Sequence, residues 1–171
     1  IKVNRGIVVD KHMETSVPGV YACGDVAEAY DFIYDANRVV AIWPNAYIGG
    51  RIAGFNMAGV PEEYDGCTAM NAFSYFEMAL ASGGMFDPDP REQCQVISAR
   101  VGDDYRKVVL KDGRIVGFVL LGAIEQSGVL YHLMQDRADV TEFQGSLLSS
   151  GFGIVSLPRE IRERWIEAES G

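Results

Sequence analysis

The hydrophobic pattern near the start of the chain predicts buried strands joined by irregular segments. Residues 20–23, Val-Tyr-Ala-Cys, form a short run of apolar and small side chains that follows Pro18-Gly19 and stops at Gly24-Asp25. Such a run is typical of a strand buried on both faces, as in parallel sheets. A second short strand is expected within residues 2–10. Residues 26–42 show no clear period, which fits a loop over a ligand or a surface excursion equally well.

The clearest helix signal runs from Trp43-Pro44 to Gly59. Proline suits the first helical position, where its missing N–H is not needed, and glycine is typical of a helix end. Small residues recur along this segment at every fourth position, which lets the helix backbone approach a neighbour closely. We expect tight packing against a sheet to explain most of this stripe, which consists of Ala46, Gly50, Gly54 and Ala58.

Beyond residue 70 the pattern changes to short strands and helices. Residues 71–78 and 95–100 are strand-like, whereas the pairs Gly83-Gly84 and Asp87-Pro88 predict an intervening loop. A hairpin is expected over residues 105–121, because two apolar strands flank Asp112-Gly113, the strongest short hairpin signal. Further helices are expected over residues 125–135, 139–150 and from Pro158 onward.

The polar residues 60–68 predict a boundary between two domains. Residues 1–60 are interpreted as the C-terminal part of an α/β domain. Residues 71–171 are interpreted as a small α+β domain of antiparallel hairpins and helices, large enough for a core of its own. The expected fold class of the whole chain is therefore α+β.

Composition narrows the functions that the chain can have. Its 171 residues include 24 acidic and 15 basic side chains, a net charge of −9, which argues against a nucleic-acid partner. No apolar run approaches the ~20 residues of a membrane span. Cys23, Cys67 and Cys94 lie far apart, so we expect no disulfide framework, no metal site and a cytoplasmic location. The chain starts at Ile1 without a signal-peptide pattern, so we interpret it as a piece of a longer protein.

Gly24 and Asp25 are the first candidate ligand-binding residues. Ligands of α/β folds bind at the carboxyl ends of strands, and glycine there lets a ligand approach the backbone. The aspartate carboxylate accepts hydrogen bonds, which suits the hydroxyl groups of a polyol or nucleotide. The alternative is an ordinary turn in which Asp25 caps the residues that follow.

The motif Thr-x-x-Pro-Gly-Val-Tyr-Ala-x-Gly-Asp-Val-Ala, residues 15–27, resembles the second flavin-binding motif of the FAD-dependent pyridine nucleotide-disulfide oxidoreductases. In that family the aspartate binds the ribityl chain of FAD, which implies this role for Asp25 beside Gly24. The segment that begins at Trp43 resembles the family's helix whose N-terminus points at the flavin ring. The resemblance implies that backbone amides near Asn45 and Ala46 face the flavin.

Residues 105–122 resemble the small C-terminal domain of the same superfamily, closest to its rubredoxin reductase and nitrite reductase flavin-module branch. Glutathione-reductase-type members carry a catalytic His-Pro pair in this domain. Neither His12 nor His132 precedes a proline, so no catalytic residue is assigned. No Gly-x-Gly-x-x-Gly turn joins a strand to a helix, so the FAD pyrophosphate and nicotinamide sites are not expected in this chain.

The resemblance implies a C-terminal portion of a larger flavoenzyme, called the parent protein below. The parent passes electrons from NAD(P)H through FAD to an acceptor, such as an electron-transfer protein. The chain then contains the tail of the FAD-binding domain and the C-terminal domain. By itself it is expected to hold little or no FAD and to be inactive. The alternative is a non-catalytic domain for homodimerisation or for docking a redox partner.

Overall fold

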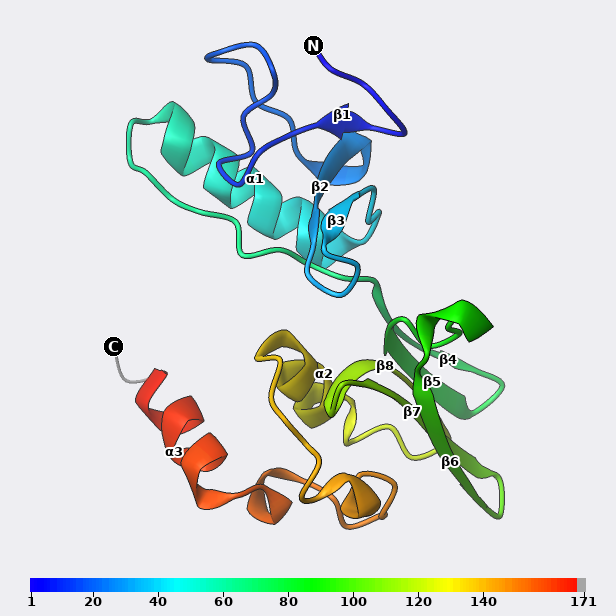
Figure 1. Cartoon of the computed structure of the whole chain (residues 1–171). Helices are drawn as coiled ribbons and strands as arrows, with labels where there is room; N and C mark the ends of the chain where they lie inside the picture. The colour runs from blue at the N-terminus through cyan, green and yellow to red at the C-terminus, as the bar shows by residue number, and fades with distance from the viewer. Residues whose placement is uncertain (169–171) are drawn as a thin grey trace. The chain divides into compact units, whose positions relative to one another are not determined.

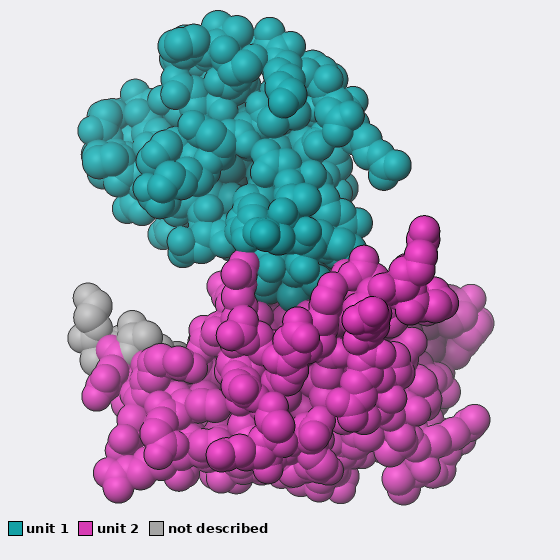
Figure 2. All heavy atoms as spheres, in the orientation of Figure 1, with its two compact units in different colours: residues 1–70 teal, residues 71–171 magenta. Residues whose placement is uncertain are grey.

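The computed structural model describes residues 1–168, which divide into two compact units (Figure 2). Unit 1 comprises Ile1–Met70, and unit 2 begins at Asn71. Each unit buries its own set of hydrophobic side chains. The α+β fold class expected from the sequence is confirmed.

Unit 1 is a three-stranded sheet with one helix (Figure 1). Strand β1 (Ile7–Val8) is parallel to β2 (Ala27–Asp31), which pairs antiparallel with β3 (Ala36–Arg38). Helix α1 (Trp43–Met57) confirms the predicted helix and has Pro44 in its first turn. The core that joins helix and strands includes Val9, Ala27, Ala29, Ile52 and Ala53.

Residues 20–23 do not form the predicted buried strand. The Thr15 amide donates to the Val20 carbonyl over 2.8 Å, and the Ala22 amide donates to the Met13 carbonyl over 3.1 Å. Val20 is 38% exposed. Apart from one bridge between residues 14 and 21, no strand of the described chain pairs with this run. Its backbone therefore folds back on residues 13–15 instead of entering a sheet.

Residues 26–42, which showed no period, contain β2, β3 and the turn between them. Strand β2 buries residues on both faces, including Glu28 and Asp31. The Glu28 carboxylate accepts hydrogen bonds from the Asn4 side chain at 3.0 Å and from two backbone amides before β1. Asp31 pairs with Arg38 at 3.0 Å. Acidic residues are usually exposed, so a buried strand that contains them is not recognised from its sequence pattern. Glu28 and Asp31 can be buried because hydrogen bonds and an ion pair compensate their charges.

A five-stranded sheet forms the body of unit 2, in the order β4-β5-β8-β7-β6 (Figure 1). The pairs β5–β8, β8–β7 and β7–β6 are antiparallel. Helix α2 (Ser127–Gln135) packs against β8 and β5. The strands are β4 (Met70–Tyr75), β5 (Met78–Gly84), β6 (Gln95–Val101), β7 (Asp104–Lys111) and β8 (Arg114–Leu121).

The predicted hairpin and the helix after it are both confirmed. Asp112 and Gly113 have φ angles of 50° and 72°, and a turn with two positive φ angles matches the twist of the flanking strands. Leu130, Leu133 and Met134 form the face of α2 that packs in the core, and each has 0% exposure. The final helix, α3 (Arg159–Ala168), also lies where Pro158 predicted it.

Two sequence predictions for unit 2 are wrong. Gly83 and Gly84 are the last residues of β5 and do not lie in a loop. Close packing explains the glycine at position 83, because a Cβ there would lie only 2.7 Å from the ring of Phe118. Residues 139–150 contain the short 3-10 helix η3 (Gln144–Ser146) and turns rather than an α-helix. Here the Val140 amide donates to the Gly113 carbonyl over 2.8 Å, which holds this segment against the hairpin.

Candidate functional site

Gly24 and Ala46, two of the four residues predicted to bind cofactor, lie close together. Gly24 opens the 3-10 helix η1 (Gly24–Val26), whereas Ala46 lies in the first turns of α1. A Cβ built on Gly24 would have Ala46 Cβ, 3.8 Å away, as its nearest neighbour outside the adjoining chain. The φ of Gly24 is +77°, a conformation that other residues adopt only at a cost. Backbone conformation rather than crowding therefore favours glycine here.

Asp25, the next residue, is exposed. Among the described residues its carboxylate has no hydrogen-bond or ion-pair partner, and it makes no capping bond within η1. The alternative role as a turn cap is therefore unsupported. A carboxylate without a protein partner can accept hydrogen bonds from the hydroxyl groups of a ligand.

The start of α1 lies beside Gly24. The first intrahelical bond runs from the Ala46 amide to the Ile42 carbonyl over 3.1 Å, and no side chain caps this end. The amides of Trp43 and Asn45 precede that bond and have no acceptor within the described chain. Free amides at a helix N-terminus favour negative charge. The Asn45 amide is thus available to a ligand, whereas the Ala46 amide is already used.

The side chain of Asn45 is committed to the fold. It is 7% exposed, its Nδ2 donates to the Val40 carbonyl over 2.8 Å, and its Oδ1 accepts from the Tyr64 hydroxyl. Tyr64 lies 19 positions away in the polar segment, so no local sequence signal pointed to it. Only the backbone of Asn45 remains for a ligand.

Gly50 of the small-residue stripe, together with Gly49 beside it, packs against the chain that leads into Gly24. A Cβ on Gly49 would lie 3.0 Å from Met13 Cε and 3.5 Å from Cys23 Cβ, and one on Gly50 would lie 3.8 Å from Cys23 Sγ. Gly54 has open space around it instead. The N-terminal half of the stripe therefore brings α1 close to η1.

A hollow of about 450 Å³ in unit 1 does not include the four predicted residues. Polar and aromatic side chains dominate its lining, which consists of Val9, Asp10, Lys11, Tyr30, Asn37, Tyr64 and Asp65. The predicted residues instead lie where η1 meets the start of α1. The candidate site is thus defined by that junction and not by a cavity.

Two protein families match the chain in succession. Residues 1–58 match the family described as pyridine nucleotide-disulphide oxidoreductase. Residues 70–138 match the rubredoxin NAD+ reductase C-terminal domain. The chain belongs to the pyridine nucleotide-disulphide oxidoreductases. Within this group it corresponds to the C-terminal part of the rubredoxin reductase and nitrite reductase branch.

Individual members of these oxidoreductases agree with that assignment. The chain is 28% identical over 143 residues to the nitrite reductase [NAD(P)H] of Bacillus subtilis, covering 83% of the chain and 17% of that protein. It is 30% identical over 128 residues to the NADH-rubredoxin oxidoreductase of Clostridium acetobutylicum, covering 72% of the chain and 31% of that protein. The chain thus spans less than a third of either relative.

The fold also matches a solved oxidoreductase structure. An FAD-dependent pyridine nucleotide-disulphide oxidoreductase from Desulfovibrio vulgaris superimposes with a TM-score of 0.73 at 18% identity, covering 96% of the chain and 44% of that protein. The likeness supports the tail of an α/β domain followed by a small α+β domain. No helix within residues 1–168 combines the length and the apolar character that crossing a bilayer requires.

Proposed function

We propose that this chain contributes the ribityl and flavin-ring half of the FAD site in its parent oxidoreductase. The observation that carries the proposal is the junction of η1 and α1. There the unpartnered Asp25 carboxylate follows a positive-φ glycine, and Gly24 lies next to Ala46 at the open end of a helix. This junction offers an acceptor for hydroxyl groups and free amides for negative charge.

Each residue has its own role in this proposal. Asp25 accepts a hydrogen bond from a ribityl hydroxyl, and Gly24 lets the ligand approach the backbone. The Asn45 amide faces the flavin ring from the end of α1, and the Ala46 methyl group lines the approach beside Gly24. FAD, when bound, supplies the chemistry that takes electrons from NAD(P)H and passes them on. The chain's residues hold and orient it.

The activity belongs to the parent in this proposal. The parent passes electrons from NAD(P)H through FAD to an acceptor. The name of the Clostridium acetobutylicum relative supports an electron-transfer protein as that acceptor. The chain alone is inactive and retains little FAD, since one end of a large, flexible ligand must be ordered without the pyrophosphate contacts at the other end.

Flavin retention by the parent tests the role of Asp25. A hydrogen bond to a charged acceptor contributes about 1.5–3 kcal/mol, so Asp25→Ala weakens FAD binding by roughly tenfold or more. Asp65→Ala removes another exposed carboxylate of unit 1 and leaves FAD binding unchanged. Binding is measured by titrating the apoprotein with FAD and following flavin fluorescence. Equal affinities for both variants, in folded protein, would refute the assignment.

As a second candidate function, unit 2 serves as a dimerisation or docking domain. A group of exposed aromatic side chains on β4 and the turn after it supports this function: Phe73 is 55% exposed, Tyr75 68% and Phe76 86%. Exposed apolar groups of this size are typical of interaction surfaces. Light scattering on the chain and on a Phe73→Ser/Tyr75→Ser variant tests this function. A monomer in both cases would exclude dimerisation of the chain through this surface.

A further inference from the structure

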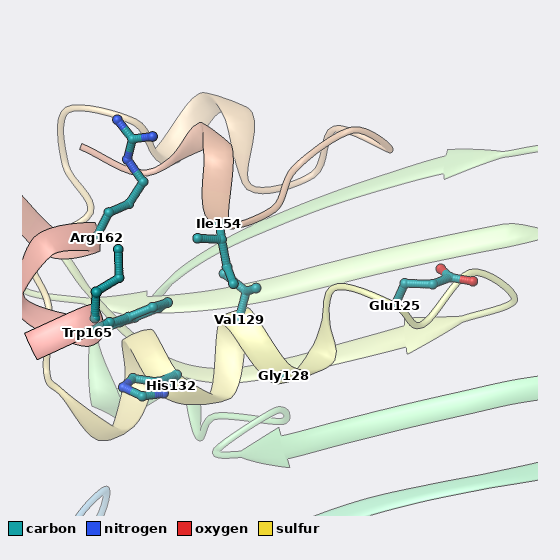
Figure 3. Close-up of a pocket in the computed structure, with 8 residues that line it drawn as sticks. Glu125, Gly128, Val129, His132, Ile154, Arg162 and Trp165 are labelled. Carbon is teal, nitrogen blue, oxygen red and sulfur yellow. The ribbon is translucent and has the colours of Figure 1, made fainter. Parts of the chain in front are cut away.

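Unit 2 contains a cavity of about 350 Å³ between α2, the 3-10 helix η4 (Ile154–Ser156) and α3 (Figure 3). Its wall is mainly apolar, and its ionisable side chains are Glu125, His132 and Arg162. Its volume lies at the lower end of the range for small-molecule sites. The remaining lining residues are Gly128, Val129, Ile154, Trp165 and Ile166.

Arg162 is the unusual member of this lining. Its Nε atom is buried and has no hydrogen-bond partner, and no ion pair of the described chain includes its guanidinium group. An unsatisfied buried donor is costly, and in native proteins it often marks a missing water, ion or ligand. Arg162 therefore lacks an acceptor among the described residues, and its terminal nitrogens, which are not buried, remain for a ligand.

Two carboxylates on or beside α3 already have other partners. Asp136 Oδ2 accepts a hydrogen bond from Trp165 Nε1 at 2.5 Å and lies 3.5 Å from an Arg164 nitrogen. Glu163 pairs with Arg159 at 2.7 Å. Within residues 1–168, the other two arginines of α3 are thus paired with carboxylates and Arg162 has no counter-charge.

The side chains are arranged along the cavity so that charge and apolar surface are separated. Figure 3 shows the Arg162 guanidinium at one end of the group and the His132 ring at the other, with Trp165, Val129 and Ile154 between them. The rings of His132 and Trp165 are in contact, with centroids 4.0 Å apart. Glu125 lies well apart from Arg162 in the same view, with its carboxylate directed away from the group.

We propose that this cavity binds a small organic acid with an aromatic or aliphatic body. The carboxylate accepts hydrogen bonds from the two terminal nitrogens of Arg162, an end-on bidentate pair, because the buried Nε is out of reach of a ligand. The body packs against Trp165, Val129 and Ile154. The proposal is independent of the FAD assignment, because every residue assigned to FAD lies in unit 1 and every residue of this cavity lies in unit 2.

The test compares two probes that differ only in charge. 4-Phenylbutyrate carries the proposed carboxylate, and 4-phenylbutan-1-ol has the same body without it. Both are titrated to about 10 mM into the full 171-residue chain carrying Trp43→Phe, so that Trp165 is the one fluorophore of its kind. Ligand efficiencies of about 0.3 kcal/mol per heavy atom place the affinity of phenylbutyrate near the millimolar range. We expect the alcohol to bind at least tenfold more weakly.

Two arginine variants locate the anion. Arg162→Gln removes the unpaired guanidinium and weakens phenylbutyrate binding at least tenfold, while the weak binding of the alcohol is unchanged. Arg159→Gln removes a cation of the same helix that is 78% exposed and paired with Glu163, and leaves both affinities unchanged. On addition of phenylbutyrate, we expect the backbone amide NMR signals around Val129 and Ile154 to change their chemical shifts.

Three results would overturn the proposal. The first is no saturable binding of phenylbutyrate, and the second is equal affinity for the acid and the alcohol, which would mean an apolar hollow without anion preference. The third is binding that Arg162→Gln and Arg159→Gln weaken equally, which would mean a general charge effect. If Arg162→Gln does not fold, the comparison of the two probes on the 171-residue chain with Arg162 intact still decides the question.

Discussion

The Tyr64 hydroxyl donates a hydrogen bond to the Oδ1 of Asn45, and both side chains are buried, at 4% and 7% exposure. This bond joins the segment after α1 to the first turn of the same helix. Asn45 in turn donates to the Val40 carbonyl on the chain that enters the helix. The end of α1 proposed to face the flavin is therefore held on both sides by a single amide group.

The first prediction follows from this bond. Tyr64→Phe leaves the Asn45 Oδ1 buried without that donor, so we expect the free energy of unfolding of unit 1 to fall by about 1–3 kcal/mol. Urea titration monitored by Trp43, in a Trp165→Phe background, reports on unit 1. Tyr47→Phe removes a hydroxyl from a side chain that is 63% exposed and changes stability by less than about 0.5 kcal/mol. Equal losses in the two variants would contradict the importance of the bond.

The second prediction concerns the backbone at Gly24. An L-residue in a left-handed conformation costs roughly 1–2 kcal/mol, so Gly24→Ala destabilises unit 1 by about that amount, and Gly24→Asn by less. Gly54→Ala is the matched control: Gly54 lies inside α1 with open space around it, so alanine there stabilises by about 0.5–1 kcal/mol. The same titration measures both. A neutral Gly24→Ala would show that the backbone relaxes out of the positive-φ region.

The third prediction uses two glycines of unit 2. Both have positive φ, but a Cβ on Gly113 would lie 2.5 Å from Thr141 Oγ1, whereas one on Gly102 meets nothing within 4 Å. Gly113→Ala therefore loses more thermal stability than Gly102→Ala, which carries only the backbone cost of about 1–2 kcal/mol. Adding Thr141→Ala recovers part of the difference. The crowding argument fails if the two alanine variants melt at the same temperature.

The fourth prediction concerns acid stability. Hydrogen bonds from the Asn4 side chain and from the Gly6 and Arg5 amides hold the pKa of Glu28 below its ordinary value of 4.5. The unfolded chain therefore takes up this proton first as the pH falls. The contribution of Glu28 is fully present above about pH 4.5 and is lost as the pH drops through the lowered pKa.

Glu28→Gln tests this sign. The variant is less stable than the native chain at pH 7, and the gap narrows as the pH falls below about 4.5. Asp89→Asn is the comparison in unit 2: hydrogen bonds from the Arg91 side chain and amide lower the pKa of Asp89 to about 2, so its contribution is lost at lower pH. Urea midpoints at several pH values measure both. A gap for Glu28→Gln that does not change with pH would rule out a protonation effect.

Sequence reasoning succeeded where the signals were local. Pro44 and Gly59 mark the ends of α1 within two residues, and Asp112-Gly113 fixes the β7–β8 hairpin through its two positive φ angles. It failed where contacts are distant. Strand β2 was not predicted because it contains the buried Glu28, whose hydrogen-bond partners lie 22–24 positions earlier in the chain. Residues 20–23 carry the composition of a buried strand, but no neighbouring strand in the described chain pairs with them.

The candidate site shows the same limit. The motif around Gly24-Asp25 and the start of α1 could be recognised separately, and the structure brings Gly24 and Ala46 together. That these residues bind FAD remains a prediction. The sequence could not show that the Asn45 side chain is used by Tyr64, because no periodicity links residues 19 positions apart. Nor could it show that Arg162 lacks a counter-charge, since that depends on which carboxylates the other arginines of α3 use.

The connection of α3 to α2 has a consequence for the motions of unit 2. Six of the ten residues of α3 are charged, and both Trp165 and Arg164 of this helix contact the carboxylate of Asp136, directly after α2. A helix with so few apolar residues is the kind of element that detaches on its own, without global unfolding. The amides of α3 are therefore expected to exchange with deuterium long before those of β7 and β8. A molecule that fills the cavity would contact both α2 and α3 and would therefore slow the exchange of the α3 amides. Ligand binding would then be detected as a slower opening of α3, without a change in the average structure.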